Sequence, residues 1–309
     1  MKIVVTGGAG FIGSHIVSKL LSKAKVKVID NLFTGKLENI KSFLDKIEFV
    51  RGDIRNLAFL KKEFKNTDYV IHIAAIPKVP FSIKYPLLIS QVNIIGTLNV
   101  LIAARDNKVR RVIYSSSSSV YGDAKLPLKE GNEKEPFSPY ALTKLVGEHY
   151  CRLFYELYGL ETVSLRLFNV FGEKQDPYGG YAAVIPRFID AILHGKRLLI
   201  YGDGKQSRDF TYVKDVADAT IMALKAEKKK VTGEVFNIAY GKTTNLLELV
   251  RLINKFTGKS IKPKFTEARK GDIKKSLADI SKAKRLLGYK PKSSLEQGLK
   301  KTIKWIEGR

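Results

Sequence analysis

Along the first half of the chain, short apolar runs rich in β-branched residues alternate with longer segments whose apolar residues recur at helical spacing. Strands that are apolar on both faces belong in a parallel sheet covered by helices. The pattern predicts strands at residues 2–6, 27–30, 47–51, 69–73, 111–115 and 162–166. It predicts helices at residues 11–23, 86–107 and 140–158. The expected fold class is α/β, with a doubly wound parallel sheet in residues 1–166.

Beyond residue 166 the alternation becomes irregular. Loops rich in glycine, proline and aspartate occur at residues 172–180 and 202–204, and helical spacing returns at residues 185–194, 213–226, 245–256 and 295–306. We interpret residues 167–309 as a smaller, mixed α/β substrate-binding domain, some segments of which return to the first domain. Since no flexible linker separates the two parts, we expect them to pack around a shared cleft.

Composition argues against several classes of protein. The 309 residues are 44% hydrophobic and 28% charged, which is ordinary for a globular chain that buries a large core. Eighteen apolar residues never run together, and the chain starts with a strand pattern, so we expect neither a membrane span nor a secretion signal. One cysteine and four histidines, none at metal-ligand spacing, argue against disulfides and metal sites. We therefore expect a cytoplasmic protein without a metal.

The net charge of +25 raises the question of a nucleic-acid partner. Lysines are scattered through helix-like segments such as residues 60–63 and 227–230, often beside acidic residues, and no segment alternates basic and aromatic side chains. This distribution favours solvated surfaces, so we expect no nucleic-acid partner. A basic surface would also attract anionic nucleotide substrates.

A glycine-rich turn, with Gly7, Gly10 and Gly13, follows the first strand and leads into a helix. Glycines here permit the tight turn, let the backbone approach a pyrophosphate, and keep helix and strand close. Asp30 closes the second strand, where its carboxylate can accept hydrogen bonds from an adenine ribose. The combination predicts a Rossmann-type site, and the negative charge of Asp30 favours NAD over NADP. Asp53, after the third strand, flanks the adenine or serves a turn.

A second chemical signal follows the fifth predicted strand. Five serines, residues 115–119, stand at its end, and the next helix contains Tyr140 and Lys144. Residues four apart share one helix face, and a nearby ammonium group favours the phenolate, so we expect Lys144 to lower the pKa of Tyr140. A phenol tuned in this way can exchange a proton with a substrate hydroxyl. The constellation predicts proton transfer beside the dinucleotide.

These motifs resemble those of the extended short-chain dehydrogenase/reductase family, and within it the UDP-hexose and UDP-N-acetylhexosamine 4-epimerases. The similarity covers essentially the whole chain and includes four further segments, at residues 72–75, 92–97, 165–172 and 208–213. The resemblance implies an NAD-dependent enzyme that oxidises the sugar at C4 and reduces the 4-keto sugar on the opposite face. It also implies a homodimer, paired through helices near residues 86–107 and 139–158.

By this resemblance, Ser117 hydrogen-bonds the reacting hydroxyl, Tyr140 is the acid/base, and Lys144 holds the nicotinamide ribose. The residues expected to bind NAD are Gly7, Gly10, Phe11, Ile12, Gly13, Asp30, Asn31, Gly35, Asp53, Ile54, Ala74, Ala75, Asn93, Tyr140, Lys144 and Phe168. The residues expected to bind the UDP-sugar are Ser117, Asn169, Val184, Tyr201, Arg208, Arg269 and Ser276. The diphosphate must stay anchored while the sugar turns, which calls for cations and amide donors.

One position bears on the identity of the sugar. In related 4-epimerases, a bulky tyrosine four residues after the Gly-Asp pair disfavours an N-acetyl group. Counting four residues from Asp272 gives Ser276, whose small side chain leaves room for an acetamido group. We therefore expect both UDP-N-acetylhexosamine and UDP-hexose as substrates. The alternative is a loop serine that a hexose enzyme merely tolerates.

Several other functions share parts of the pattern. Nucleotide-sugar 4,6-dehydratases place an Asp-Glu pair where this chain has serines, and UDP-glucuronate decarboxylases tend to carry a glutamate there. A UDP-glucuronate 4-epimerase shares the serines, and 4-keto-sugar reductases share the serine, tyrosine and lysine. The alternative outside enzymology is a nucleotide- or RNA-binding scaffold with an idle cofactor site, which would not need a matched proton-transfer set.

Overall fold

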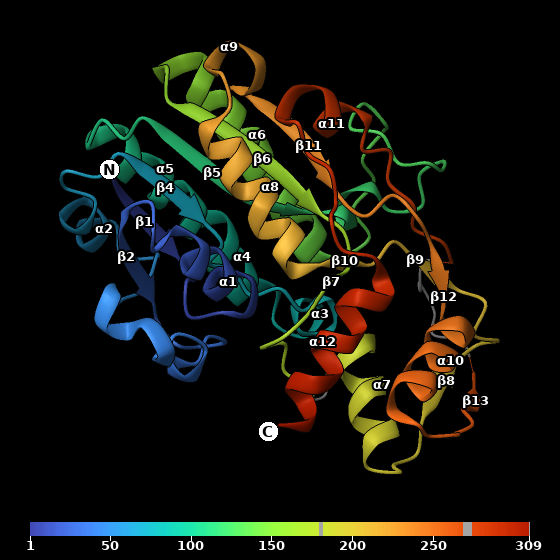
Figure 1. The fold of residues 1–309 in the computed structure, drawn as a ribbon. Helices are drawn as coiled ribbons and strands as arrows, with labels where there is room; N and C mark the ends of the chain where they lie inside the picture. The colour runs from blue at the N-terminus through green and yellow to red at the C-terminus, as the bar shows by residue number, and fades with distance from the viewer. Residues whose placement is uncertain (179–181, 268–273, 309) are drawn as a thin grey trace.

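A computed structural model describes residues 1–178, 182–267 and 274–308. Its central sheet has seven strands in the order β11-β6-β5-β4-β1-β2-β3, and every neighbouring pair is parallel (Figure 1). The strands are β1 (Lys2–Thr6), β2 (Lys25–Asp30), β3 (Glu48–Arg51), β4 (Tyr69–His72), β5 (Arg111–Ser117), β6 (Glu161–Leu167) and β11 (Glu234–Ile238). The chain order reverses between β1 and β4, at the crevice where open α/β sheets bind ligands. The predicted α/β fold class is confirmed.

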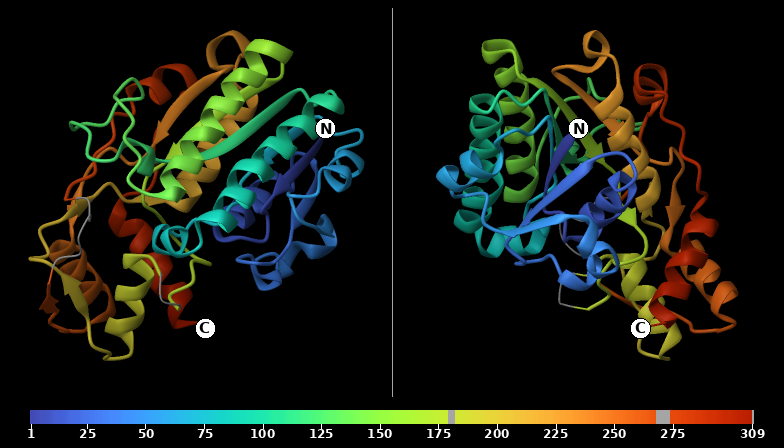
Figure 2. Two further views of the ribbon diagram at one scale, coloured as in Figure 1. Left: turned by 180° about the vertical axis from the view of Figure 1, so that it is seen from behind. Right: turned by 60° about the vertical axis from the view of Figure 1, so that its left-hand side comes forward.

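Helices cover both faces of this sheet. Figure 1 shows α1 (Phe11–Leu20) and α8 (Val213–Lys225) in front of it. The view from behind in Figure 2 shows the opposite layer, formed by α2 (Leu57–Glu63), α4 (Pro86–Ser90), α5 (Gly96–Asp106) and α6 (Pro139–Tyr158). Both faces of the strands are therefore buried, which explains their continuous apolar sequences.

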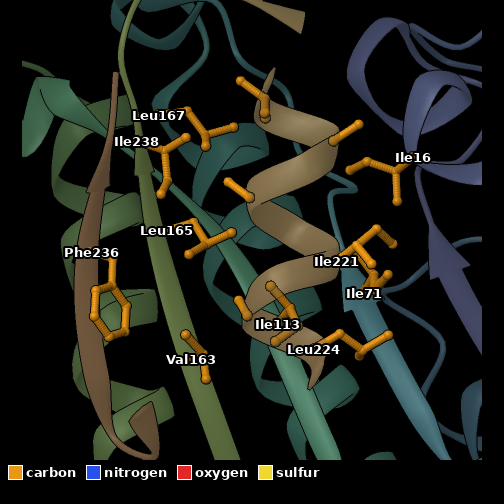
Figure 3. Close-up of a cluster of buried hydrophobic side chains, with 14 of the residues drawn as sticks. Ile16, Ile71, Ile113, Val163, Leu165, Leu167, Ile221, Leu224, Phe236 and Ile238 are labelled. Carbon is orange, nitrogen blue, oxygen red and sulfur yellow. The ribbon is translucent and has the colours of Figure 1, made fainter. Parts of the chain in front are cut away.

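Alternate residues of the inner strands supply two separate cores. Ile71 and Ile113 contribute to the core beneath α8, with Ile221 and Leu224 of that helix (Figure 3). Their neighbours in sequence, such as Val112, contribute to the core beneath α5 and α6. This separation follows from the two-residue period of a strand.

Part of the C-terminal half of the chain joins this sheet. Strand β11 pairs with β6, and α8 packs on α1. The sequence pattern did not predict β11, a five-residue edge strand whose first residues are not buried. Its position depends on a long-range contact with β6 that no local period reveals.

The remaining C-terminal segments form a smaller lobe, at the lower right of Figure 1. Its core packs between α7 (Val184–Leu193), α10 (Leu246–Thr257) and α12 (Leu295–Glu307), near the helices expected from the sequence. Its described residues also form three short strand pairs, namely β7 (Val170–Phe171) with β10 (Thr211–Tyr212), β8 (Leu199–Tyr201) with β13 (Lys264–Thr266), and β9 (Ser207–Arg208) with β12 (Thr244–Asn245). Further short helices are α3 (Val79–Lys84), α9 (Lys228–Val231), α11 (Ser281–Leu287), and the 3₁₀ segments Leu37–Asn39, Lys41–Lys46 and Ser118–Tyr121.

The helix predicted at residues 86–107 consists of α4, one π-helical turn (Gln91–Ile95) and α5. By length and composition alone, this 86–106 helix could cross a membrane, and within the described ranges it is the single helix that meets that test. The expectation of no such segment considered only uninterrupted apolar runs, whereas this helix includes polar residues such as Asn93. Of its most apolar window, 56% is buried inside the protein, against α2 and α6.

Candidate functional site

A cavity of about 610 Å³ lies where the carboxyl ends of β1, β2, β4 and β5 meet the C-terminal lobe. It brings together most of the residues expected from the sequence to bind cofactor or substrate. These are Gly7, Gly10, Phe11, Ile12, Gly13, Asp30, Asn31, Ile54, Ala74, Ala75, Ser117, Tyr140, Lys144, Asn169, Arg208 and Ser276. A volume of this size is typical of a site for a small molecule or cofactor.

Other expected binding residues do not line this cavity. The cavity lining does not include Gly35, Asp53, Asn93, Phe168, Val184 or Tyr201, and Arg269 lies outside the described residues. Phe168 is fully buried beneath the wall and packs near Tyr121, with 6.2 Å between the ring centroids. The Asp53 carboxylate accepts hydrogen bonds from Arg55, which hold its pKa at about 2, and from Asn31.

The turn after β1 forms a cradle that only glycines permit. Gly7 adopts φ +75°, and a β-carbon there would lie 2.6 Å from the backbone nitrogen of Ala74. Helix α1 begins directly after Gly10, whose backbone faces the cavity. The N-terminus of a helix attracts anionic groups, so this turn fits the pyrophosphate of a dinucleotide.

Asp30 is positioned at the end of β2 by the same turn. Its Oδ2 accepts a hydrogen bond from the Ala9 nitrogen over 3.0 Å, and its Oδ1 accepts one from the Leu32 nitrogen over 2.8 Å. Burial raises the pKa of this carboxyl, although both hydrogen bonds oppose the rise. A β-carbon on Gly35 would lie 2.8 Å from both oxygens, so Gly35 leaves space for the carboxylate. Each oxygen keeps acceptor capacity for a ribose hydroxyl.

A buried hydrogen-bond chain supports the loop after β4. Thr97 Oγ1 donates to the Asn93 carbonyl over 2.6 Å, so His72 Nε2 donates to Thr97 Oγ1 and His72 Nδ1 accepts from Thr6 Oγ1. Burial and the nearby charge of Lys144 lower the pKa of His72 to about 3. The chain thus connects the strand before the glycine turn to the long helix through a neutral imidazole.

Asn93 supports the cavity wall from behind. Its Oδ1 accepts from the Ile76 nitrogen over 2.9 Å, and its Nδ2 donates to the Ile76 carbonyl and to Thr143 Oγ1. Thr143 Oγ1 in turn donates to the Tyr140 carbonyl over 2.8 Å. Asn93 therefore positions the loop after β4 relative to helix α6.

Local sequence places Tyr140 at the start of α6. The Ser138 side chain caps the helix by accepting from the Ala141 nitrogen, and Pro139 occupies the first turn, where its missing N–H costs nothing. The Tyr140 nitrogen donates to Ser82 Oγ over 3.1 Å. The phenol is nearly buried and hydrogen-bonds the side chain of Ser117, at the end of β5. The predicted serine and tyrosine are therefore brought together.

The expected effect of Lys144 on the pKa of Tyr140 is not found. Burial raises the pKa of the Tyr140 phenol, and the hydrogen bond from Ser117 opposes that rise. Lys144 Nζ instead donates to the Ser115 carbonyl over 2.7 Å and lies 5.0 Å from the centre of the Tyr114 ring. Burial lowers the pKa of Lys144 to about 8, so the amine is still mostly charged at neutral pH.

The C-terminal lobe supplies the opposite wall. The Ser276 nitrogen donates to the Ser207 carbonyl over 3.1 Å, which fixes Ser276 beside β9 and Arg208. The Asn169 Nδ2 donates to the Asp209 carbonyl over 3.2 Å. Asp209 is fully buried and accepts from the backbone of residues 240, 241 and 278, so it holds two further segments of the chain behind this wall.

Several residues that line the cavity were not expected from the sequence. They include Phe33, Arg55, Lys78, Gln175, Tyr178 and Lys275. The first three stand in loops directly after β2, β3 and β4. Loops at the carboxyl ends of parallel strands form the ligand crevice of this fold class, so their position in the chain was the available signal.

Metal-ligating side chains do not cluster within the described part of the chain, where no group of three or more His, Cys, Asp or Glu residues could hold an ion. The chemistry that the arrangement supports is proton transfer by Tyr140 beside a dinucleotide cradle. The buried phenol and its serine partner lie at the same sheet edge as the glycine turn.

Comparison with known proteins agrees with this geometry. Residues 3–239 match the model of the NAD dependent epimerase/dehydratase family. The UDP-N-acetylglucosamine 4-epimerase from Methanobrevibacter ruminantium M1, solved in complex with UDP-N-acetylmuramic acid, is 44% identical, with a TM-score of 0.95 over 99% of this chain and 98% of that one.

Two further solved structures are similar over the whole chain. The UDP-glucose 4-epimerase from Thermotoga maritima, solved with UDP-glucose, is 39% identical, with a TM-score of 0.95 over 100% of this chain and 99% of that one. The UDP-glucuronic acid 4-epimerase from Bacillus cereus, in complex with UDP-glucuronic acid and NAD, is 38% identical, with a TM-score of 0.93 over 100% and 99%.

Proposed function

Since the chain belongs to the NAD dependent epimerase/dehydratase family, we propose that it catalyses the C4 epimerisation of UDP-sugars. The proposed substrates are UDP-N-acetylglucosamine and UDP-glucose, with their galacto epimers. NAD is the cofactor, and the glycine cradle and Asp30 fit its pyrophosphate and adenine ribose.

In the proposed reaction, NAD when bound would accept a hydride from C4 of the sugar and later return it. Tyr140 removes the proton of the 4-hydroxyl as that hydride leaves, and returns a proton when the 4-keto sugar is reduced on its other face. Ser117, which already bonds the phenol, holds the reacting oxygen. Lys144, one helical turn after Tyr140, keeps an ammonium group in the cavity wall. Arg208 and Asn169 anchor the diphosphate while the sugar turns.

The observation that carries this proposal is the distribution of acids around Tyr140. Among the described residues that line the cavity, the carboxylates are Asp30 and Asp176. Asp30 serves the cofactor end, and Asp176 pairs with Lys36 at 2.6 Å. Elimination of water from a 4-keto sugar needs a further acid and base beside the sugar. The Ser117–Tyr140 pair supports oxidation and reduction at one carbon without such elimination.

The test is to incubate the purified protein separately with UDP-N-acetylglucosamine and UDP-glucose, without reductant, and to follow the anomeric protons by NMR. We expect each sugar to reach an equilibrium with its galacto epimer, at the same ratio whichever of the two epimers is the starting material. Tyr140→Phe should lower kcat at least a thousandfold, whereas Tyr150→Phe, on the same helix outside the cavity, should leave it unchanged.

Other outcomes of this test would support one of the alternative functions. Turnover of UDP-glucuronate alone would indicate a uronate 4-epimerase, and stoichiometric consumption of added NADH would indicate a reductase. Absence of NAD and of any product, with salt-sensitive RNA binding, would favour the scaffold alternative.

The proposed partner is a second copy of this chain. The helix of residues 86–106 and helix α6 expose large apolar side chains, at Leu87, Ile95, Leu142, Leu153 and Leu157, and Leu87 is 71% exposed. The two helices pack against each other, and large exposed apolar side chains on neighbouring helices are typical of an interface. Two such helices from each protomer would form a four-helix bundle and bury this surface.

Sedimentation equilibrium tests this partner. Leu142→Lys combined with Leu153→Lys should convert a dimer to a monomer, because each places a charge in the proposed interface. Leu44→Lys, which alters a leucine of similar exposure in the 3₁₀ segment Lys41–Lys46, should leave the dimer intact. A wild-type monomer at micromolar concentration would contradict the proposal.

A further inference from the structure

A buried cluster of Ser116, Glu148 and Arg166 lies next to the catalytic serine. The Ser116 hydroxyl donates to Glu148 Oε1 over 2.5 Å. Arg166 Nε donates to the same oxygen over 2.8 Å, and Arg166 Nη2 donates to Oε2 over 2.6 Å. The arginine and glutamate side chains are only 2% and 5% exposed. The pair is therefore bidentate and shielded from water, which makes its hydrogen bonds short and directional.

Glu148 continues a series of residues on one face of α6. Tyr140, Lys144 and Glu148 follow one another at intervals of four residues, so they occupy successive turns. Lys144 bonds the carbonyl of Ser115, and Glu148 bonds the hydroxyl of Ser116. Successive helical turns thus hold successive residues of β5, immediately before Ser117.

Arg166 ties the neighbouring strand into the same arrangement. Ser116 and Arg166 stand directly opposite each other in the parallel pairing of β5 with β6. The Arg166 guanidinium also lies 4.6 Å from the centre of the Tyr121 ring. A buried ion pair contributes little net stability compared with apolar side chains of the same volume. Its place behind the catalytic serine is better explained by the geometry that it imposes.

We propose that Glu148, oriented by Arg166, is a positioning residue that holds the end of β5 through Ser116, so that Ser117 faces the Tyr140 hydroxyl. This inference rests on the proposed epimerisation, in which Ser117 and Tyr140 touch the sugar. Glu148 acts through Ser116 and does not meet the substrate. All the serines of residues 115–119 line the cavity, and among them Ser117 bonds the Tyr140 phenol whereas Ser116 anchors the strand to Glu148.

The least disruptive test is Ser116→Ala, which removes one hydroxyl and leaves both hydrogen bonds between Glu148 and Arg166. We expect kcat to fall at least tenfold with KM and NAD content unchanged, and Ser116→Thr, which keeps the hydroxyl, to restore most of it. The matched control is Ser164→Ala, which removes a buried hydroxyl from β6 that hydrogen-bonds Cys151 on α6. This control should retain wild-type kcat.

A second readout separates positioning from general loss of stability. The Ser117 hydrogen bond lowers the pKa of Tyr140, so misplacing Ser117 should raise that pKa. Carbon-13 NMR of ring-labelled tyrosine would follow its titration, with the Tyr140 signal assigned by its loss in Tyr140→Phe. We expect the titration to move to higher pH in Ser116→Ala and to stay in place in Ser164→Ala.

The two proposals fail in distinguishable ways. If Ser116→Ala matches Ser164→Ala in kcat and in the Tyr140 titration, the positioning role of Glu148 is overturned. If the wild type epimerises no UDP-sugar, the proposed function fails, and the titration alone decides the positioning role. A shift in Ser116→Ala would then support it, and an unchanged titration would overturn it.

Discussion

A β-carbon on Gly13 would lie 2.1 Å from the carbonyl oxygen of Gly7, so helix α1 crosses the turn after β1 at a distance that only glycine allows. The next nearest atoms are the Gly8 Cα and the Gly7 carbonyl carbon, at 2.8 and 2.9 Å. All of these obstructing atoms belong to the backbone. A larger residue would therefore displace the cradle itself, because no flexible side chain is available to move aside.

Gly13→Ala is expected to lower the free energy of unfolding by roughly 1–3 kcal/mol, the usual cost of overpacking, and to weaken NAD binding at least tenfold. Calorimetric titration with NAD and urea unfolding would measure both effects. Gly131→Ala is the control, because a β-carbon there has nothing within 4 Å. Wild-type NAD affinity in Gly13→Ala would show that the turn does not bind the pyrophosphate.

The ion pair between Lys36 and Asp176 joins the loop after β2 to the C-terminal lobe at the cavity wall. The backbone nitrogen of Lys36 also donates to the Ala9 carbonyl in the glycine turn over 3.0 Å. Exposed ion pairs contribute about 0.2–1 kcal/mol, so Lys36→Ala should speed NAD release by a factor of roughly 1.5–5. Stopped-flow displacement of NAD would measure this rate, with Lys46→Ala as a surface control. Equal rates in both variants would show that the ion pair between Lys36 and Asp176 does not slow NAD release.

His72 should make the fold sensitive to acid. Its pKa is about 3 in the folded chain, whereas an unfolded histidine titrates near about 6.5. Between these values only the unfolded chain binds the proton, so this contribution to stability is complete above pH 6.5 and is lost as the pH falls. The expected loss between pH 7 and pH 5 is about 2 kcal/mol.

Urea unfolding at pH 7, 6 and 5 would measure this dependence. The difference between wild type and His72→Gln isolates the contribution of His72 from that of the carboxylates. His194→Gln alters a histidine whose side chain is 52% exposed, and should keep the wild-type slope. Parallel pH curves for wild type and His72→Gln would contradict a neutral buried imidazole.

Ser276→Tyr should suppress turnover of UDP-N-acetylglucosamine at least a hundredfold while it spares UDP-glucose. Ser276 is buried in the cavity wall and is held to Ser207 by its backbone, so a tyrosine ring there would occupy space beside the sugar. Comparison of kcat/KM for both sugars would test this, with Ser276→Ala as the small-residue control. An equal loss of both activities would contradict a role of Ser276 in the choice between the two sugars.

Local sequence determined the parts of this protein that depend on periodicity and backbone chemistry. Continuous apolar runs predicted six of the central strands within a few residues, because each is buried on both faces. The glycines before α1 and the four-residue interval between Tyr140 and Lys144 indicated a cofactor turn and a proton-transfer face. Each motif lies within one turn or one helix, so it can be recognised from residues that are close together in the sequence.

Tertiary structure alone decided which distant groups meet. It placed β11 beside β6, directed the Lys144 amine to the Ser115 carbonyl, and buried the Tyr140 phenol so that its pKa rises. It also joined Glu148 to Ser116 and Arg166, which are 32 and 18 residues away in the chain. Such contacts depend on how strands and helices pack and on how much water they exclude. Neither can be predicted from the spacing of residues along a single helix or strand.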